Sequence, residues 1–438
     1  MVLQRQERTL LYKTCVLFAL LGIVACSDTG SGPTPPPPPG NGIVLSGIPA
    51  PDSALQQLGI VIKVHIDTTS FGTCALQIDG AGVAGDLCFG TDFIIGGAVP
   101  TQGAHTARFT FAKYPSDPVT FDSSFTFTTV APKIDRYSAV LLPPLPGDSL
   151  AGGSDMNESG VVVGQSVAPD GTSRPVRWIA GQPAALPHEN ANYGVASSIN
   201  AAGAIAGLLG PPGSVTVIWT PTDSIITVTD SDPPVRINDA GQVLTQEWSR
   251  PTEPHEGFLI YDMTTGTSTQ VEIPYPHEPR LTDFNNKGQA IGSDFGDFSD
   301  GLPVVWQYGG VSFPGVQVMY APHGGSSDAL DLTDSSEVLM ATNGWVVFGT
   351  SASSVVLTPF FGTGSPQRAN NNDVVVGVGR DSALYLWRRS ANITERIDAG
   401  TGWTFSSVQK LNDNGAILAR GQNSATGQSG SVVLTPIG

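Results

Sequence analysis

The chain has 438 residues, and only 13% of them are charged, whereas glycine (52) and proline (35) are abundant. Ordinary soluble domains carry about 25% charged residues, and helical bundles are rich in Ala, Glu, Lys and Leu. The formal net charge of -17 excludes the basic surface that nucleic-acid-binding proteins use. We therefore expect an all-β protein that is long enough to bury a large core.

Residues 1–25 have the pattern of a secretory signal peptide. Arg5, Arg8 and Lys13 precede an apolar run at 14–24, which is too short to span a bilayer. The run ends in Leu-Gly-Ile-Val-Ala-Cys at 21–26, which resembles a bacterial lipobox. The resemblance implies a lipoprotein in which Cys26 is diacylated and becomes the mature N-terminus. An ordinary cleaved signal with an incidental cysteine is the alternative.

Residues 26–42 are predicted to be the lipidated cysteine followed by a Pro/Gly-rich tether. Five prolines at 35–39 favour polyproline II, which extends about 3.1 Å per residue and would hold the body away from the lipid. Ser27 stands where an Asp would favour inner-membrane retention. The predicted location is the outer membrane or cell surface, with a periplasmic-facing anchor as the alternative.

Four cysteines are present, and two of them remain for the folded body. Cys15 leaves with the signal and Cys26 would carry lipid, so Cys74 and Cys88 are left in an oxidising compartment. We predict a disulfide between them that closes a short loop. A metal pair is less favoured, because no third and fourth soft ligands are nearby.

Residues 43–131 contain alternating, β-branched segments separated by Gly, Pro and Asp turns. This pattern predicts a small β-sandwich. Gly103 to Phe109 resembles a late strand of bacterial immunoglobulin-like modules, so we expect an immunoglobulin-like fold. His65 and His105 are predicted to be strand residues rather than ligands. The predicted strands are 60–66, 75–78, 92–95, 107–111 and 121–130.

Residues 132–438 contain a repeated pattern of an apolar residue, an asparagine, a tight turn and a hydrophobic run. In Asn-x-x-Gly the asparagine caps the turn and the glycine takes a positive φ. The small residue four positions after the glycine, such as Gly164, lets a neighbouring backbone approach closely. Two copies have Ser336 and Asp373 in place of the glycine, which leaves their register open. The asparagine positions recur about every 42 residues at Asn157, Asn200, Asn238, Asn285, Thr333, Asn370 and Asn412.

Most copies continue with a strand that ends in an aromatic residue, as at Trp178 and Trp219, and then a further apolar stretch. We interpret these aromatics as core between neighbouring units. Four strands in about 40 residues make one propeller blade, so residues 132–438 predict a seven-bladed β-propeller. A β-solenoid is the alternative. The segment 137–142 is predicted to complete the last blade and cover its exposed edge.

The repeats resemble the HAF-type extracellular repeat family, over about 300 residues. In the first copy, Asn157, Gly160 and Gly164 follow the family pattern, and His255 with Phe258 echoes its name-giving segment. The resemblance implies a secreted or surface protein with no assigned reaction, so it bears on location and shape only.

Three histidines that follow proline are the candidate ligand face. His188, His277 and His323, with Glu189 and Glu278, are predicted to lie in loops on one face of the propeller. Imidazole and carboxylate suit a divalent transition metal or acid–base chemistry on a glycan. The simpler interpretation, which we favour, is that these loops never meet. The acidic stretch 294–301 could hold Ca²⁺, although solvated turns are the favoured interpretation.

No nucleophile elbow, phosphate-binding loop or metalloprotease motif occurs, so no catalytic residue and no cofactor are predicted. We expect a monomeric, membrane-anchored cell-envelope module that binds a glycan or an envelope protein and no nucleic acid. The first alternative is a surface carbohydrate-active enzyme, assisted by a divalent metal on the loop histidines. The second is a structural partner in envelope assembly.

Overall fold

The fold was analysed in a computed structural model. The residues that it describes are 43–46, 48, 54–55, 59–66, 72–88, 92–99, 101–113, 121–188, 191–210, 215–228, 233–247, 257–272, 279–294, 302–307, 317–318, 327–342, 345–349, 356–357, 364–390 and 393–437. The predicted signal peptide, Cys26 and the tether lie outside them. Within the described part, we find no helix of the length and apolar character that a membrane span requires.

The N-terminal strands form two sheets around one core. Inward residues alternate along the strands, as at Ile60, Ile62 and Val64 in one sheet and Leu76 and Phe109 in the other, and they join a single cluster. One sheet has the order β1 (Ile43–Ser46), β3 (Gly59–Ile66), β6 (Asp92–Ala98). The other has the order β2 (Ala54–Leu55), β8 (Phe121–Thr129), β7 (Gly103–Ala112), β4 (Gly72–Ile78), β5 (Ala81–Cys88).

The five strands predicted in this region are all strands in the structure, and His65 and His105 lie in β3 and β7, as predicted. His105 Nδ1 lies 2.7 Å from Asp79 Oδ2. Cys74 is buried and disulfide-bonded. Cys88 ends the neighbouring strand β5, and its pairing with Cys74 stays a prediction.

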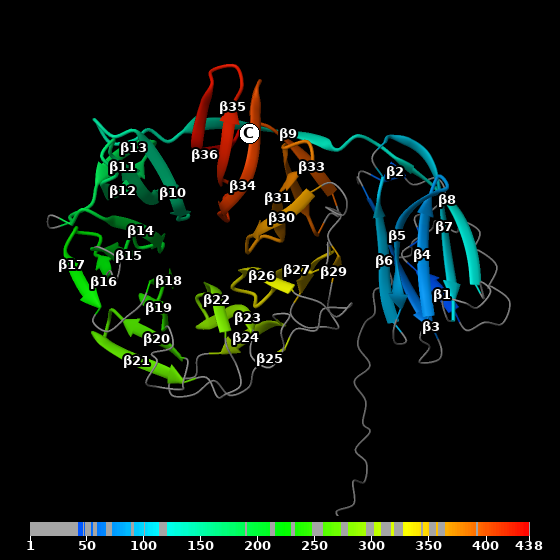
Figure 1. The fold of residues 1–438 in the computed structure, drawn as a ribbon, viewed down its shortest axis with the longest axis horizontal. Helices are drawn as coiled ribbons and strands as arrows, with labels where there is room; N and C mark the ends of the chain where they lie inside the picture. Colours follow the sequence, from blue (N-terminus) through cyan, green and yellow to red (C-terminus); the bar gives the residue numbers. More distant parts are fainter. Residues whose placement is uncertain are drawn as a thin grey trace, which may run out of the picture. The chain divides into compact units, whose positions relative to one another are not determined.

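The repeat region is built from four-stranded antiparallel sheets, each formed by consecutive strands (Figure 1). The first three are β10 (Leu150–Met156), β11 (Val162–Val167), β12 (Ser173–Ile179), β13 (Gln182–Ala185); β14 (Gly194–Ile199), β15 (Ile205–Leu209), β16 (Val215–Trp219), β17 (Ile225–Val228); and β18 (Pro234–Ile237), β19 (Gln242–Glu247), β20 (Gly257–Asp262), β21 (Thr267–Glu272). The next three are β22 (Pro279–Phe284), β23 (Gln289–Asp294), β24 (Leu302–Gln307), β25 (Gln317–Val318); β26 (Ser327–Leu332), β27 (Val338–Thr342), β28 (Trp345–Gly349), β29 (Val356–Leu357); and β30 (Gly364–Ala369), β31 (Val374–Gly379), β32 (Leu384–Arg388), β33 (Ile393–Asp398).

The last sheet takes one strand from the beginning of the repeat region. It contains β34 (Trp403–Leu411), β35 (Ile417–Asn423) and β36 (Gln428–Pro436), and β9 (Lys133–Leu141) pairs antiparallel with β36. The first half of β9 also pairs in parallel with β33. The predicted use of segment 137–142 as the closing strand is therefore confirmed, and the open edge of β36 is covered.

The repeated turn has the predicted conformation. Asn157 Oδ1 accepts the backbone N–H of Val161 at 3.0 Å, and Gly160 has a φ of 78°. Ser336 and Asp373 adopt the same left-handed conformation, with φ of 70° and 61°. The glycine is therefore replaced in two copies without loss of the turn, and both copies keep the strand pairing of the others.

The turn asparagines also join neighbouring sheets. Each Nδ2 donates to the backbone oxygen of the equivalent residue in the next sheet, and the series returns from Asn412 to Asn157 at 3.2 Å. We call this series of hydrogen bonds the asparagine belt. Thr333 occupies the asparagine position in one copy and has no amide to donate. The other links are Asn157 to Asn200 (3.3 Å), Asn200 to Asn238 (3.1 Å), Asn238 to Asn285 (3.2 Å), Asn285 to Thr333 (2.9 Å) and Asn370 to Asn412 (3.0 Å).

Replacing Thr333 with asparagine should supply the missing link to Asn370. The new Oδ1 can accept the Glu337 N–H that Thr333 Oγ1 now accepts at 3.1 Å, and the amide can reach the next sheet. We expect the free energy of unfolding to rise by about 1 kcal/mol, the net contribution of one hydrogen bond. Urea unfolding would measure it, with Thr333→Ala as the control that loses stability. An asparagine variant no more stable than the wild type would contradict the role of this belt.

The predicted aromatic core between sheets is confirmed at three tryptophans. Trp178, Trp219 and Trp387 are almost completely buried. Trp178 Nε1 donates to the Pro143 oxygen at 2.8 Å, and Trp219 Nε1 donates to Pro187 at 2.7 Å. Because the Trp178 and Trp219 indole N–H groups have backbone acceptors, these two large side chains can be buried without an unpaired polar group.

The small residues after the turns allow the close backbone contact that the sequence predicted. A Cβ atom on Gly164 would overlap the Gly152 carbonyl oxygen of the neighbouring inner strand. The same overlap would occur at three equivalent glycines, Gly207, Gly292 and Gly377.

Candidate functional site

The innermost strand of each repeat sheet contains a β-bulge at the same place. In β10, for example, the pairing register shifts between Gly153 and Asp155. A bulge adds one residue to a strand and redirects the side chains beside it. The residue that follows the bulge stands two positions before the turn asparagine, and it is polar or charged in every copy. We call these residues the axial ring: Asp155, Ser198, Arg236, Asp283, Asp331, Arg368 and Lys410.

Acceptor groups of the axial ring bond to the next inner strand. Asp155 Oδ2 accepts Ser198 Oγ–H at 2.9 Å and the Ile199 N–H at 3.1 Å. Asp283 Oδ2 accepts the Leu332 N–H at 3.0 Å. The ring therefore connects successive sheets along the axis, parallel to the asparagine belt. Two further links of this kind are Ile237 N–H to Ser198 Oγ (3.3 Å) and Ala369 N–H to Asp331 Oδ2 (2.9 Å).

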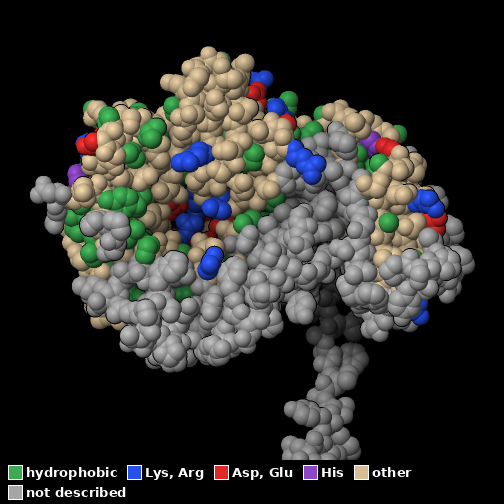
Figure 2. All heavy atoms as spheres, viewed as in Figure 1, with side chains coloured by type: hydrophobic (Ala, Val, Ile, Leu, Met, Phe, Trp, Pro, Cys, Tyr) green, Lys and Arg blue, Asp and Glu red, His purple; other side chains and the backbone are tan. Residues whose placement is uncertain are grey.

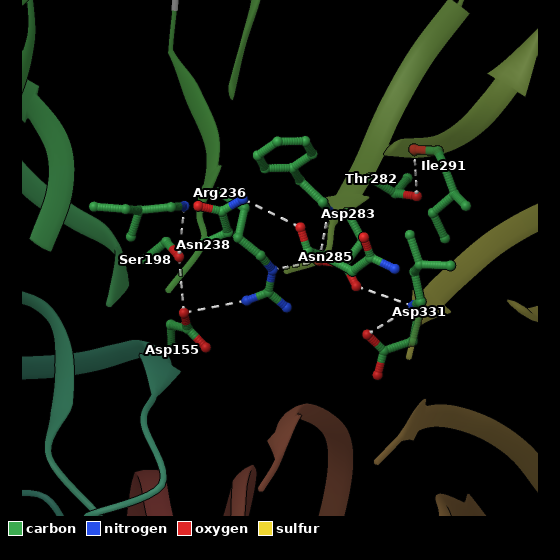
Figure 3. A network of polar contacts seen from close by, with 12 residues as sticks. Asp155, Ser198, Arg236, Asn238, Thr282, Asp283, Asn285, Ile291 and Asp331 are labelled. Carbon is green, nitrogen blue, oxygen red and sulfur yellow. Dashed lines mark hydrogen bonds and ion pairs between the residues drawn. The ribbon is translucent and has the colours of Figure 1, made fainter. Parts of the chain in front are cut away.

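Arg236 lies between two buried carboxylates (Figure 3). Its Nη1 is 3.1 Å from Asp155 Oδ2, and its Nε forms an ion pair with Asp283 Oδ1. The Asp155 and Asp283 side chains are each only 5% exposed, and Arg236 is 18% exposed. Since an isolated charge at such depth is costly, this triad must hold together as a unit.

Neighbouring charges shift the pKa values of the ring carboxyls in opposite directions. Burial raises the pKa of Asp155 and Asp283, but Arg236, together with Lys410, outweighs burial and lowers both. Burial and the Asp283 charge raise the pKa of Asp331 to about 7, although Lys410 and Arg368 oppose the shift. The Asp283 and Asp331 carboxyls both accept the Leu332 N–H, at 3.0 and 3.2 Å. Asp331 is therefore the partner that carries the proton below neutral pH.

The raised pKa of Asp331 predicts a fall in stability between about pH 4 and pH 7. The native state binds this proton more tightly than the unfolded chain, whose Asp pKa is near 3.8. The stabilisation is complete below that value and is lost as pH rises through about 7, at up to about 1.4 kcal/mol per pH unit. Asp331→Asn should remove most of this fall, because an amide does not titrate and its oxygen can still accept the Ala369 N–H. Burial also raises the pKa of Glu158, which contributes the remainder.

Urea unfolding at several pH values from 4 to 8 would measure the effect. The low pKa values of Asp155 and Asp283 act in the opposite direction and mainly below about pH 5, so the slope from pH 5 to 7 reports Asp331. Asp170→Asn, in an exposed turn, is the control. A pH slope in Asp331→Asn equal to that of the wild type would show that Asp331 does not hold the proton.

A second set of equivalent residues, one position after the turn asparagines, surrounds the mouth of an axial cavity. Asn286 Nδ2 donates to Asp239 Oδ2 and Asp334 Oδ2, both at 2.9 Å. Asn371 Nδ2 bridges Asp334 and Asp413 at 3.3 and 3.0 Å. The amides thus hold the carboxylates in fixed positions. We call these residues the rim: Glu158, Ala201, Asp239, Asn286, Asp334, Asn371 and Asp413.

The axial cavity has a volume of about 140 Å³ and is lined by the rim and by Arg236, Asp283 and Lys410 of the axial ring. Figure 2 shows basic and acidic side chains together in this hollow. Lys410 is half-buried, and within the described part of the chain its ammonium forms no hydrogen bond or ion pair within bonding distance. The cavity therefore has two cationic groups and the Asp283 carboxylate inside, and further carboxylates at its mouth.

A second cavity, of about 350 Å³, adjoins the first. It lies between the last and first repeat sheets and is lined by residues of β9, β36, β11 and β12 and by turns. Met156 and Glu158 line both cavities. The axial site thus has a charged part and an apolar extension.

Of the ligand face predicted from sequence, only His188 lies among the described residues. Its Nδ1 is 2.9 Å from the Leu186 carbonyl oxygen, which is a local contact within the same segment. Glu189, His277, Glu278 and His323 lie outside the described residues, as does 295–301, so their convergence stays a prediction. No cluster of three or more His, Cys, Asp or Glu suited to a metal ion occurs in the part of the chain described.

The axial ring and the rim were not among the predicted site residues, although the sequence contains a pattern that indicates them. When the copies are aligned on their asparagines, the position two residues earlier is always polar and in six copies charged. The position one residue later is acidic or amide in every copy except Ala201. A position buried among apolar side chains would be apolar in most copies, so the polar residues at these two positions indicate a different role.

No protein-family model matches the chain, and no curated protein matches it. Solved structures with a similar fold include YCF48 bound to D1 peptide, at 13% identity and a TM-score of 0.45, covering 69% of this chain and 97% of that one. The β-propeller domain of the Trilobed protease from Pyrococcus furiosus has 13% identity and a TM-score of 0.47, covering 65% and 95%. Oligogalacturonate lyase from Vibrio parahaemolyticus has 12% identity and a TM-score of 0.45, covering 68% and 93%. At these values the similarity concerns the fold alone and says nothing about function.

Proposed function

We propose that the protein is a lipid-anchored binding module of the bacterial cell envelope that recognises a protein partner through its axial cavity. The observation that carries this proposal is the rim, where carboxylates are held around a cavity mouth by bridging amides. Binding groups that are already in place cost less conformational entropy when a ligand arrives. A concave site with fixed polar groups is the usual form of a binding site.

The rest of the proposed architecture follows the sequence. A signal peptide at 1–25, lipidated Cys26 and a tether to residue 42 would precede an immunoglobulin-like sandwich at 43–131 and a seven-bladed propeller of HAF-type repeats at 132–438. The asparagine belt, which runs through successive sheets and back to Asn157, supports a closed ring of seven blades. The sandwich would act as a stalk and the lipid would hold the protein at the outer membrane or cell surface.

The charge of the rim favours a protein partner over an anionic glycan. Glu158, Asp239, Asp334 and Asp413 place four carboxylates at one mouth, on a chain of net charge -17. Such a surface attracts lysine and arginine side chains and repels acidic polymers. The alternative of a metal-assisted carbohydrate-active enzyme depends on His277 and His323, which lie outside the described residues, so no observed contact favours it.

The test uses a fluorescein-labelled tetralysine peptide against the full-length protein. We expect binding that weakens with added salt and falls about three- to tenfold in Glu158→Gln, which keeps an acceptor for the Asp413 N–H now bonded to Glu158 Oε2 at 2.8 Å. Asp170→Asn removes one exposed charge elsewhere and should bind like the wild type. Equal losses in the two variants would mean that only net charge matters, and equal binding of tetraglutamate would reject the proposed site.

A further inference from the structure

The apolar cavity beside the rim lies where the first and last repeat sheets meet. We call it the closure cleft. Its floor is formed by buried side chains of Leu142, Met156 and Trp178, and one wall by Val140 and Val433. These residues come from β9 and the residue after it, from β36 and from the first repeat sheet, so the closing of the ring itself creates the cleft.

The entrance of the closure cleft is bordered by small residues. The turn at Ala180 and Gly181 lies on one side, with φ of 49° and 77°. Val140 on the other side is 49% exposed, and a Cβ added to Gly181 would lie 3.8 Å from it. The accessible apolar surface is therefore that of the Val140 wall, whereas the floor side chains are almost completely buried.

The closure cleft and the rim form one continuous surface. Glu158 lines both cavities and accepts the Asp413 N–H, so two rim carboxylates stand at the end of the cleft. The cleft volume of about 350 Å³ falls within the roughly 300–1,000 Å³ of ligand pockets. An occupant must therefore combine an apolar group with a positive charge.

We propose that the closure cleft takes an apolar side chain of an extended partner segment, while a basic side chain of that segment contacts Glu158 and Asp413. In an extended segment, residues i and i+2 point to the same side, about 6.6 Å apart. The recognised pattern is thus a lysine or arginine two residues from a leucine, isoleucine or phenylalanine. This inference rests on the proposed function and specifies the partner that it would recognise.

The test is a hexapeptide array in which two positions separated by one glycine carry every pair of standard amino acids. Full-length protein should be enriched on peptides with one basic and one large apolar residue. Val140→Trp fills the cleft and should reduce the apolar preference at least tenfold while the basic preference remains. Glu158→Gln should reduce the basic preference while the apolar preference remains. Ile134→Trp is the matched control, because Ile134 lies on the same strand and is 60% exposed.

The outcomes separate this inference from the proposed function. Selection of basic residues with no apolar preference would overturn the cleft assignment and leave the rim as a cationic site. No selection at either position would reject both. Self-association of the wild-type protein in sedimentation, lost in Val140→Trp but not in Ile134→Trp, would assign the cleft to a second copy and overturn the inference.

Discussion

Arg236→Met is expected to lower the free energy of unfolding by about 3–5 kcal/mol. The substitution leaves Asp155 and Asp283 buried, each with a 5% exposed side chain, and without the guanidinium that keeps their pKa values low. Both carboxyls would then have to take up protons or remain as uncompensated charges. Because they also bond to neighbouring inner strands, the strain would extend across several sheets. Urea denaturation followed by tryptophan fluorescence measures the change.

Two variants show whether the loss comes from unpaired charge. In Asp155→Asn/Arg236→Met/Asp283→Asn all three charges are absent, so most of the lost stability should return. Arg177→Met removes an arginine whose ion pair with Asp223 is more exposed, at 25% and 39%, and should cost about 1 kcal/mol or less. If Arg236→Met cost no more than Arg177→Met, the axial triad would not be the source of stability that its burial indicates.

Gly164→Ala is expected to cost about 3 kcal/mol or more, because overpacking against backbone cannot be relieved by a side-chain rotation. The new Cβ would overlap the Gly152 carbonyl oxygen and also meet the Gly153 Cα at 2.9 Å. To remove the overlap, β10 and β11 would have to separate, and the ladder between them would weaken. Thermal and urea unfolding both report the loss.

The control lies on the facing strand, where Gly152 pairs with Gln165, the residue after Gly164. A Cβ on Gly152 would approach only the flexible Gln165 side chain, at 3.7 Å, so Gly152→Ala should change stability by about 0.5 kcal/mol or less. Similar effects of the two substitutions would mean that the strands can move apart freely, contrary to the close approach assigned to Gly164.

Much of the fold was predictable because its signals are local. The alternation of apolar residues from Ile60 to Ile66 and the turn chemistry of Asn157 and Gly160 depend on a few adjacent residues. One missed strand, β5 (Ala81–Cys88), contains four Ala or Gly residues and an Asp, so it lacks the β-branched pattern. Ser336 and Asp373 left the register open because neither residue type usually takes positive φ, yet the flanking strands hold both in that conformation.

The candidate site was less predictable, because it is assembled from residues about 40 positions apart. The burial and the ion pairs of Arg236 depend on which residues the neighbouring inner strands place beside it. His188 and the other loop histidines are conspicuous as possible ligands or acid–base groups. The charged residues two positions before six of the seven turn positions are not conspicuous in the sequence. A bulge in each inner strand redirects their side chains.

Most of the strands, the repeated turn, the small residue at Gly164 and the closing strand at 137–142 could be inferred from the sequence alone. These features follow from backbone sterics at the turns, from the alternation of apolar residues along a strand, and from the need to cover the open edge of the last sheet. Each of these causes acts over a short stretch of chain or on one pair of strands. The pairing of the charges, the proton on Asp331 rather than on Asp283, and the position of Glu158 between two cavities all depend on the folded arrangement. Electrostatic energy and burial depend on distances between sheets, and those distances exist only once the chain has folded.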